Sequence, residues 1–417
     1  MQFPHSVRAL NSRNYRLFFI GNGLALIGNW MALTASAWLI YELSNSAFLV
    51  GFLPFVGQIP VLLAPFGGIL GDRVPRRKLL IVLTLFCSLQ IGTLATFTLS
   101  GNITVVSLLA LVAIRGFINA IEFPTRQSFI VEMVSNRADL PNAIALNSSL
   151  FNVARLIGPA LGGALIAFSG PGFCYLVGAI MYLAVSISLT SMRTSHRART
   201  TAPAHPLVEL KAGLHYARHS PPILASLIMV GMIAMAGFAA SNLSPIFARD
   251  IYHGDSRTLG FMMSAVGAGA LASAILLARR PNPSGLARWV AGGAFVIAAG
   301  QLGFAVSPNL PLAFACLVAT GFGTVLSMAG NNTLIQSHVE DDKRGRVMGL
   351  FAMCQGMFPI GALAAGALAA QLGPRSAVVV GSAGTALAGL IFIRNRRSMH
   401  PATPPHHPAP LPQDSQT

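Results

Sequence analysis

Long continuous runs of apolar residues recur along the whole chain of 417 residues, as at 79–99 and 308–330. A helix that crosses a bilayer needs about 20 consecutive apolar residues, whereas a strand of a membrane barrel alternates apolar and polar residues over about ten. Charged residues make up only 10% of the sequence, against about 25% in a soluble domain. The runs therefore predict an all-α membrane protein.

Twelve runs are long enough to span a membrane, so we expect twelve transmembrane helices. A basic, polar stretch separates the first six from the last six, and Gly158–Gly163 resembles Gly361–Gly366. Parallel repeats of this kind are typical of transporters. The runs lie at about 17–40, 46–70, 79–99, 103–123, 143–168, 172–191, 222–247, 258–278, 289–307, 310–330, 347–371 and 376–393.

The runs predict a division of the chain into five parts. Within the linker, apolar residues recur at helical spacing, which predicts an amphipathic helix at the membrane surface. The tail is rich in proline and is expected to be disordered. The parts are a cytoplasmic N-terminal arm (1–16), an N-terminal six-helix bundle (17–191), a cytoplasmic linker with the amphipathic helix (192–221), a C-terminal six-helix bundle (222–393) and the cytoplasmic tail (394–417).

The net charge of +16 is explained by the distribution of Lys and Arg over this topology, and we do not expect a nucleic-acid-binding surface. Of the 28 Lys and Arg residues, 23 fall in the arm, the tail and the loops on one side. Only Arg249, Arg257 and Arg375 fall on the other side. By the positive-inside rule both termini are cytoplasmic, and the cations face anionic lipid headgroups. The Ala35–Ala37 stretch resembles a signal-peptide cleavage site, but cleavage would break this charge pattern.

The loop "GGILGDRVPRRKLL" (67–80) concentrates charge between the second and third runs. Its pattern resembles the signature loop of the major facilitator superfamily, carried here by Gly68, Asp72, Arg73, Arg76 and Arg77. The resemblance implies that the loop acts as a latch that steadies the outward-facing state. In this sequence a proline, at position 75, replaces the usual glycine and stiffens the turn. Alternatively, the loop cations only anchor the topology.

The fourth run carries charges inside the membrane. Arg115, Asn119 and Glu122 lie on one face of the predicted helix, and Arg126 follows at its cytoplasmic end as a possible partner of the latch acid. A charge within a membrane helix is costly and suggests function. Arg115 resembles the second motif of the superfamily, which is linked to proton coupling. Glu122 is then a proton carrier, or alternatively a structural partner of an arginine.

The fifth run contains "NVARLIGPALGG". Its Gly158, Pro159, Gly162 and Gly163 resemble the third motif of the superfamily, which is associated with exporters that exchange substrate for protons. Small residues allow close helix packing and proline allows a bend. The alternative is an ordinary glycine-rich helix contact.

Polar side chains within the runs are candidates for a substrate cavity. Arg155, near the midplane of the fifth run, suits an anionic or carbonyl-rich group, or it pairs with Glu122. Amides in a bundle either join helices or line a cavity, and both readings stay open. The candidates are Asn22, Asn29, Asn119, Asn152, Arg155 and Gln355.

The sequence has no phosphate-binding loop of an ATP motor and no compelling metal-ligand cluster, so we expect neither an enzyme nor a cofactor or metal. Its four cysteines lie singly in apolar runs and are expected to be buried hydrophobes. The resemblance covers residues 10–395 and is strongest to bacterial drug and siderophore efflux members of the enterobactin-exporter type.

The resemblance implies a monomeric transporter in the bacterial cytoplasmic membrane that exports a small organic solute by alternating access and is driven by protons. One alternative keeps the fold and reverses the direction, as an uptake permease for a metabolite. A second is a non-transporting membrane enzyme or a lipid flippase.

Overall fold

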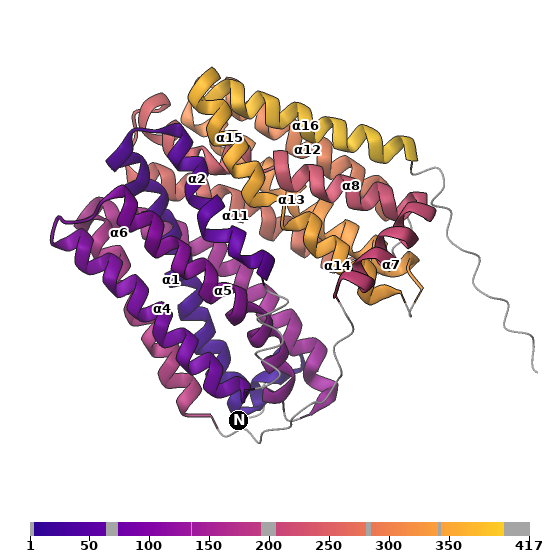
Figure 1. The fold of residues 1–417 in the computed structure, drawn as a ribbon, viewed down its shortest axis with the longest axis horizontal. Coiled ribbons are helices and arrows are strands. Elements are labelled where there is room, and N and C mark those ends of the chain that lie inside the picture. The colour runs from indigo at the N-terminus through magenta and orange to yellow at the C-terminus, as the bar shows by residue number, and fades with distance from the viewer. Residues whose placement is uncertain are drawn as a thin grey trace, which may run out of the picture.

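The computed structural model describes residues 4–63, 74–134, 136–192, 206–280, 285–340 and 343–395, and every regular element in these ranges is a helix (Figure 1). Ten helical segments within them are long and apolar enough to cross a membrane, and one shorter apolar segment covers 47–62. The chain is thus an all-α membrane protein. The long helices are α1 (Arg13–Ser44), α4 (Arg76–Leu99), α5 (Val105–Met133), α6 (Leu140–Thr190), α11 (Ser256–Ala278), α12 (Leu286–Val306), α13 (Leu310–His338) and α16 (Pro374–Asn395).

The remaining helical elements are shorter. They are η1 (His5–Asn11), α2 (Ala47–Gln58), η2 (Ile59–Leu63), η3 (Arg137–Asp139), α7 (Pro206–His219), α8 (Pro221–Ala236), α9 (Ala239–Asn242), α10 (Ser244–Ile246), η4 (Phe247–Ile251), α14 (Arg344–Gln355) and α15 (Phe358–Leu372).

Each of the twelve predicted runs is helical over most of the part that the structure describes, although several are divided differently from the prediction. The fifth and sixth runs form the single element α6, which is broken at Gly170 with φ of 82°, a conformation that glycine adopts without steric cost. The seventh run is interrupted after α8 and ends in the π-helical turn η4. The eleventh run is divided at Gly356 into α14 and α15.

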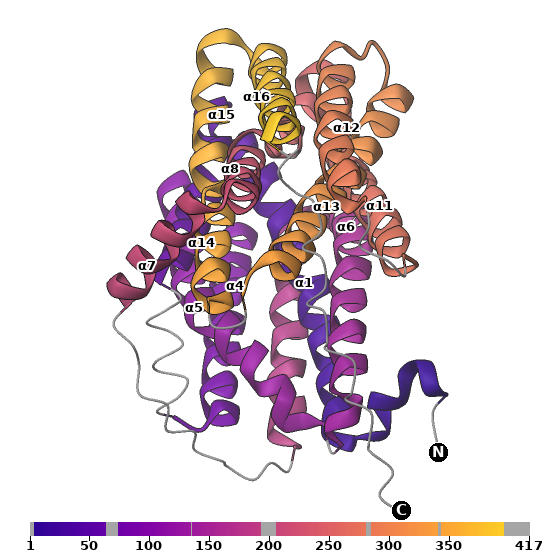
Figure 2. The same ribbon diagram turned by 90° about the vertical axis from the view of Figure 1, so that its right-hand side faces the viewer.

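The helices form two groups, which we call the N-half (α1–α6) and the C-half (α8–α16). Within the N-half, α1 lies along α6 (Figure 2), and small residues bring the two backbones together. A methyl group on Gly28 would come 3.3 Å from the Cα of Gly178. Within the C-half, α12 packs on α13 in the same way at Gly300, where a methyl group would come 2.8 Å from the carbonyl oxygen of Cys316. Such contacts suit helices packed in lipid.

The linker helix α7 lies against α14 of the C-half. The Nζ of Lys343 lies 4.9 Å from the ring centroid of Tyr216, and Ala217 is buried in a cluster with Val347. The described part of the predicted linker is thus mostly helical, and Tyr216 and Ala217 at its end pack on α14.

The two halves touch at one end and diverge toward the other, which carries the N-terminal arm and α7 (Figure 1). We call the touching region the outer contact and the diverging ends the basic end. The outer contact pairs α2 with α15 and α6 with α11 through glycines. A methyl group on Gly51 would come 2.7 Å from the Cα of Gly366, and one on Gly163 would come 2.9 Å from the Cα of Gly260. Substitution at these positions would therefore push backbone against backbone.

Candidate functional site

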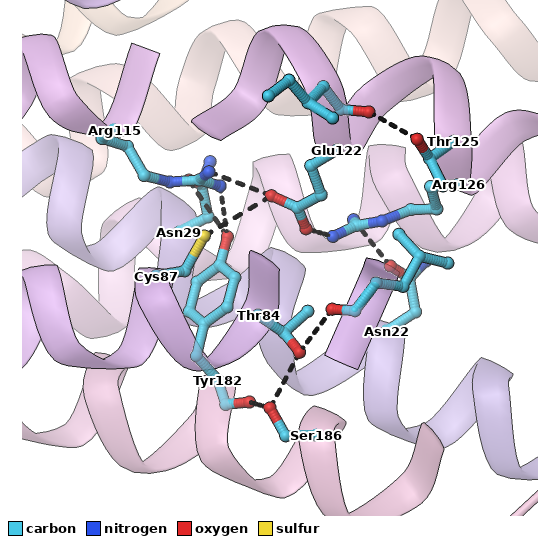
Figure 3. A network of polar contacts seen from close by, with 12 residues as sticks. Asn22, Asn29, Thr84, Cys87, Arg115, Glu122, Thr125, Arg126, Tyr182 and Ser186 are labelled. Atoms are coloured by element: carbon cyan, nitrogen blue, oxygen red, sulfur yellow. Dashed lines mark hydrogen bonds and ion pairs between the residues drawn. The ribbon is translucent and has the colours of Figure 1, made fainter. Parts of the chain in front are cut away.

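Glu122 of α5 is a buried acid held between two arginines (Figure 3). Its side chain is only 2% exposed, and its Oε2 lies 3.0 Å from Nη1 of Arg115. Its Oε1 forms an ion pair with Nη2 of Arg126. The three residues lie on one face of α5 because their spacing of seven and four residues corresponds to whole helical turns. The structure therefore shows Glu122 paired within its own helix.

Side chains from α1 and α6 complete this network. The Nη2 of Arg115 donates to the hydroxyl of Tyr182 at 2.6 Å and to Oδ1 of Asn29 at 3.4 Å. The Nη1 of Arg126 donates to Oδ1 of Asn22 at 2.9 Å, and Asn22 in turn donates to Oδ1 of Asn147 at 3.0 Å. Two of the predicted cavity amides, Asn22 and Asn29, therefore join helices through the charge network.

The network holds two guanidinium groups and one carboxylate inside the N-half. Removing the negative charge would leave two cations close together in a region of low dielectric, which is costly. Protonation of Glu122 would therefore favour the movement of at least one arginine away from the carboxyl group. This arrangement can couple proton binding to a movement of Arg115 or Arg126.

The thiol of Cys87 on α4 borders the same carboxylate, with Sγ 3.6 Å from Oε2 of Glu122. One turn away, the hydroxyls of Thr84 and Ser186 lie 2.8 Å apart and join α4 to α6 (Figure 3). Sequence reasoning missed Tyr182 and Cys87, because a single tyrosine or cysteine in an apolar run carries no periodic signal.

Two arginines of the signature loop tie the start of α4 to its neighbours at the basic end. The Nη1 of Arg76 lies 2.6 Å from Oε1 of Glu132 near the end of α5. Arg77 donates to the carbonyl oxygens of Leu189 at 2.8 Å and Thr190 at 2.6 Å, where α6 ends. A cation at a helix C-terminus satisfies free carbonyl groups and the helix dipole.

The rest of the predicted latch lies outside the described residues. Gly68, Asp72 and Arg73 belong to this part. The described partners of Arg126 are Glu122 and Asn22.

The glycine motif in α6 packs against two different partners. A methyl group on Gly158 would come 2.5 Å from the Cβ of Trp30, and one on Gly162 would come 3.0 Å from the Cα of Met31, both in α1. Gly163 instead faces Gly260 of α11, which also lies against the carbonyl oxygen of Pro159. The motif therefore joins the interior of the N-half to the outer contact with the C-half.

Arg155, one turn before the motif, is not paired with Glu122. Its guanidinium carbon lies 5.9 Å from the ring centroid of Trp30 in α1. Of the other cavity candidates, Asn152 donates to the carbonyl oxygen of Ser148 in its own helix. Asn119 is half-buried and Gln355 is exposed. The structure thus separates Arg155 from the charge network.

The outer contact contains polar partners that the sequence did not reveal. The hydroxyl of Tyr41 in α1 donates to Oδ2 of Asp250 in η4, and the guanidinium of Arg249 lies 5.7 Å from the ring centroid of Tyr41. The hydroxyl of Ser256 donates to the carbonyl oxygen of Gly163 at 3.0 Å. These contacts cross between the halves over more than 90 residues of sequence, so no local pattern predicts them.

Comparison with known protein families gives one model that matches nearly the whole chain, over residues 6–413, and that model is described as "Transmembrane secretion effector". The chain is 24% identical to the Staphyloferrin A transporter of Staphylococcus aureus over 84% of this chain and 87% of that protein. It is 26% identical to the Enterobactin exporter EntS of Citrobacter koseri over 89% of this chain and 86% of that protein.

Several solved structures with a similar fold are described as transporters. A bacterial homologue of the human lysosomal transporter Spinster, inward-facing and occupied, superposes with a TM-score of 0.73 at 14% identity, covering 93% of this chain and 97% of that one. A bacterial homologue of the iron transporter ferroportin gives a TM-score of 0.66 at 18% identity, covering 93% and 99%. These similarities concern the fold.

Proposed function

Because the chain belongs to the transmembrane secretion effector family of the major facilitator superfamily, we propose that it exports a small organic solute by alternating access in exchange for protons. The family and the similar proteins are transporters rather than enzymes, and the chain is a multi-pass bacterial membrane transporter for a small solute. We place it in the cytoplasmic membrane with both termini inside, on the positive-inside pattern of its lysines and arginines, and we carry over the monomeric state from the family resemblance.

The direction of transport is proposed from the similar proteins and the glycine motif. One similar protein is named an enterobactin exporter and another a staphyloferrin A transporter. The residues Gly158, Pro159, Gly162 and Gly163 match a motif of proton-exchanging exporters, and they form a continuous packing surface from α1 to α11. A drug-like compound or a siderophore is therefore the proposed cargo.

The observation that carries proton coupling is the pairing of Glu122 with both Arg115 and Arg126. Among the described residues, Glu122 is the one acid that is buried. When a proton neutralises its carboxylate, the two cations repel each other and Arg126 is released toward the basic end. We propose that Arg126 then pairs with the loop acid Asp72, for which its position in the sequence makes it a candidate partner.

In the proposed cycle the two halves rock about the cargo. The structure closes the outer contact through Gly51–Gly366, Gly163–Gly260 and Tyr41–Asp250, while the basic ends diverge. In the alternate state the outer contact opens, and the loop of Gly68, Asp72, Arg73, Arg76 and Arg77 fastens the basic ends. In the outward-facing state the cargo leaves and a proton binds, and in the inward-facing state the proton leaves and new cargo binds, so exchange needs both conformational changes of the cycle.

The test is proton release from detergent-purified protein as cargo candidates are added. Siderophores and lipophilic cations form the panel. We expect the parent protein to release protons on binding, Glu122→Gln to release none, and Glu42→Gln, a matched change at an exposed glutamate of α1, to behave as the parent. Release that survives in Glu122→Gln would place the proton on another acid, with Asp72 next, and binding without release would contradict proton exchange.

Direction is tested separately with inside-out membrane vesicles. A pH gradient, acid inside, should drive accumulation of a bound candidate in vesicles that contain the protein, and dissipating the gradient should abolish it. Cells that lack the protein should retain more of the compound. Reduced uptake by such cells would instead show an uptake permease.

A further inference from the structure

Arg155 is a cation in the membrane-spanning part of the N-half, and it has no anionic partner among the residues that the structure describes. In the part of the chain that the structure describes, its guanidinium makes neither an ion pair nor a hydrogen bond, and its named contact is the ring of Trp30 at 5.9 Å. A charge in a membrane protein usually faces a cavity or a partner. By contrast, Arg115 and Arg126 share the carboxylate of Glu122.

Trp30, the ring beside Arg155, carries a second hydrogen-bond donor without a partner among the described residues. The indole Nε1 of Trp30 is buried without a hydrogen-bond partner in the described residues. Tryptophan has only a donor there, and arginine carries five donors and no acceptor. A buried polar group without a partner is destabilising unless water or a ligand satisfies it. The two side chains, Trp30 and Arg155, form what we call the corner. Both offer hydrogen-bond donors to a ligand, and neither offers an acceptor.

The walls of this corner are aromatic. Phe151, one turn before Arg155 on α6, contacts Trp30 edge to face with ring centroids 6.1 Å apart, and its side chain is 45% exposed. Gly158 seats Trp30 against α6, since a methyl group there would come 2.5 Å from the Cβ of Trp30. The aromatic pair and the cation are thus held in a defined arrangement rather than on a mobile loop.

The corner also borders the contact between the two halves. A methyl group on Gly267 of α11, in the C-half, would come 2.8 Å from the carbonyl oxygen of Arg155. A ligand at the corner would therefore lie beside the seam along which the halves move against each other. Its binding would favour one arrangement of the halves over the other.

We propose that Trp30, Phe151 and Arg155 form the subsite that selects the cargo, and that it takes a planar anionic group attached to an aromatic ring. The arginine fork matches two oxygens of a carboxylate or of a comparable oxygen pair, and the indole N–H supplies a further donor. The exposed face of Phe151 packs on the ring. This inference rests on the proposed transport function and specifies its substrate class.

The experiment compares three probes of one shape and different charge: 2-naphthoate, 2-naphthamide and 2-naphthamidinium. Binding to the full-length protein in lipid nanodiscs is measured by competition saturation-transfer NMR. We expect the parent to bind the anion at least roughly tenfold more tightly than the neutral amide, and the cation least, because a charge-assisted pair is stronger than a neutral hydrogen bond.

Substitutions in the corner test whether these residues cause the preference for the anionic probe. Arg155→Gln should bind the anion and the amide equally, Arg155→Lys should keep part of the preference, and Trp30→Phe should weaken the binding of all three probes. Arg257→Gln is the matched control, because this arginine also stacks on a ring, that of Phe168 at 4.5 Å, but lies at the outer end with an exposed side chain. It should bind as the parent does.

Equal binding of anion and amide by the parent would overturn the inference, as would a preference that persists in Arg155→Gln. The lysine variant keeps the charge, and thermal unfolding of each variant checks that the fold is intact. Anion preference without vesicle transport would contradict the proposed function alone. Vesicle transport without anion preference would contradict this inference alone.

Discussion

The hydroxyl of Tyr41, close to the end of α1, donates a hydrogen bond to the carboxylate of Asp250, which lies 209 residues later in η4. The bond joins the N-half to the C-half at the outer contact. Arg249, the neighbour of the acid, lies over the same ring, with its guanidinium carbon 5.7 Å from the centroid. Tyr41 is therefore held from two sides by the opposite half, while Asp250 is exposed at the rim.

Asp250→Asn and Tyr41→Phe should shift the population toward the state in which the outer contact is open. Each removes a charge-assisted hydrogen bond that exists only while the halves touch. Spin-label distances across the two outer ends should show a larger fraction of the long distance in both variants. The matched control is Asp255→Asn, since Asp255 caps α11 within the C-half through the amides of Arg257 and Thr258.

That control should lower the thermal stability slightly and leave the distance distribution unchanged. An unchanged distribution in Asp250→Asn would show that the glycine contacts alone hold the outer ends together.

Glu122→Gln should destabilise the N-half strongly. The change leaves Arg115 and Arg126 buried without a counter-ion, and breaking a buried ion pair in this way costs about 3–5 kcal/mol. Thermal unfolding in detergent is the measurement. The double variant Glu122→Gln with Arg126→Gln should recover part of the loss, because it removes one of the two repelling charges. Strictly additive losses would contradict a shared network.

Gly163→Ala and Gly260→Ala should each weaken the outer contact. The added methyl group would come within 2.9 Å of the Cα of Gly260 in the first variant and 3.0 Å of the Cα of Gly163 in the second. Cysteine pairs across α6 and α11 should then cross-link more slowly. Gly292→Ala in α12 is the control, because no atom of the described residues lies within 4 Å of the added methyl group. Equal cross-linking rates in all three variants would refute close packing at this seam.

Arg77→Gln should loosen the basic end of the N-half. Arg77 satisfies the carbonyl groups of Leu189 and Thr190 where α6 ends, and glutamine is too short and uncharged to replace both bonds. We expect a loss of about 1–3 kcal/mol, seen as a lower unfolding midpoint and as faster hydrogen exchange near Thr190. Lys78→Gln, at the exposed next position, should change neither observable. Comparable effects of the two variants would indicate that the stability depends on the positive charge of the loop and not on the hydrogen bonds of Arg77.

Most of the fold could be predicted from local composition. An apolar run in lipid has to satisfy its backbone hydrogen bonds within the protein, whatever its neighbours are. The length of the run alone therefore indicates a helix. The break inside α6 could have been anticipated, since Gly170 precedes Pro171. The division of the seventh and eleventh runs could not, because it depends on how α8 and α15 pack against other helices.

The candidate site was predicted only in part, because its contacts between helices also depend on how the helices pack. Helical spacing placed Arg115 and Glu122 on one face, and the structure pairs them at 3.0 Å. Spacing left open whether Arg155 also reached Glu122. The structure answers this because α1 lies between them in the packing, with Asn22 and Asn29 facing the network and Trp30 facing Arg155.

The apolar runs, the one-sided arginines and the motif residues were thus enough to define a helical membrane transporter with two repeats. Those features act through distances of a few helical turns or through the bilayer itself, so they can be read along the chain. The partners of Glu122, the stacking of Arg155 on Trp30 and the Tyr41–Asp250 bond depend on tertiary packing. A side chain meets the residue that helix packing brings within about 3–6 Å, and that residue can lie anywhere in the sequence.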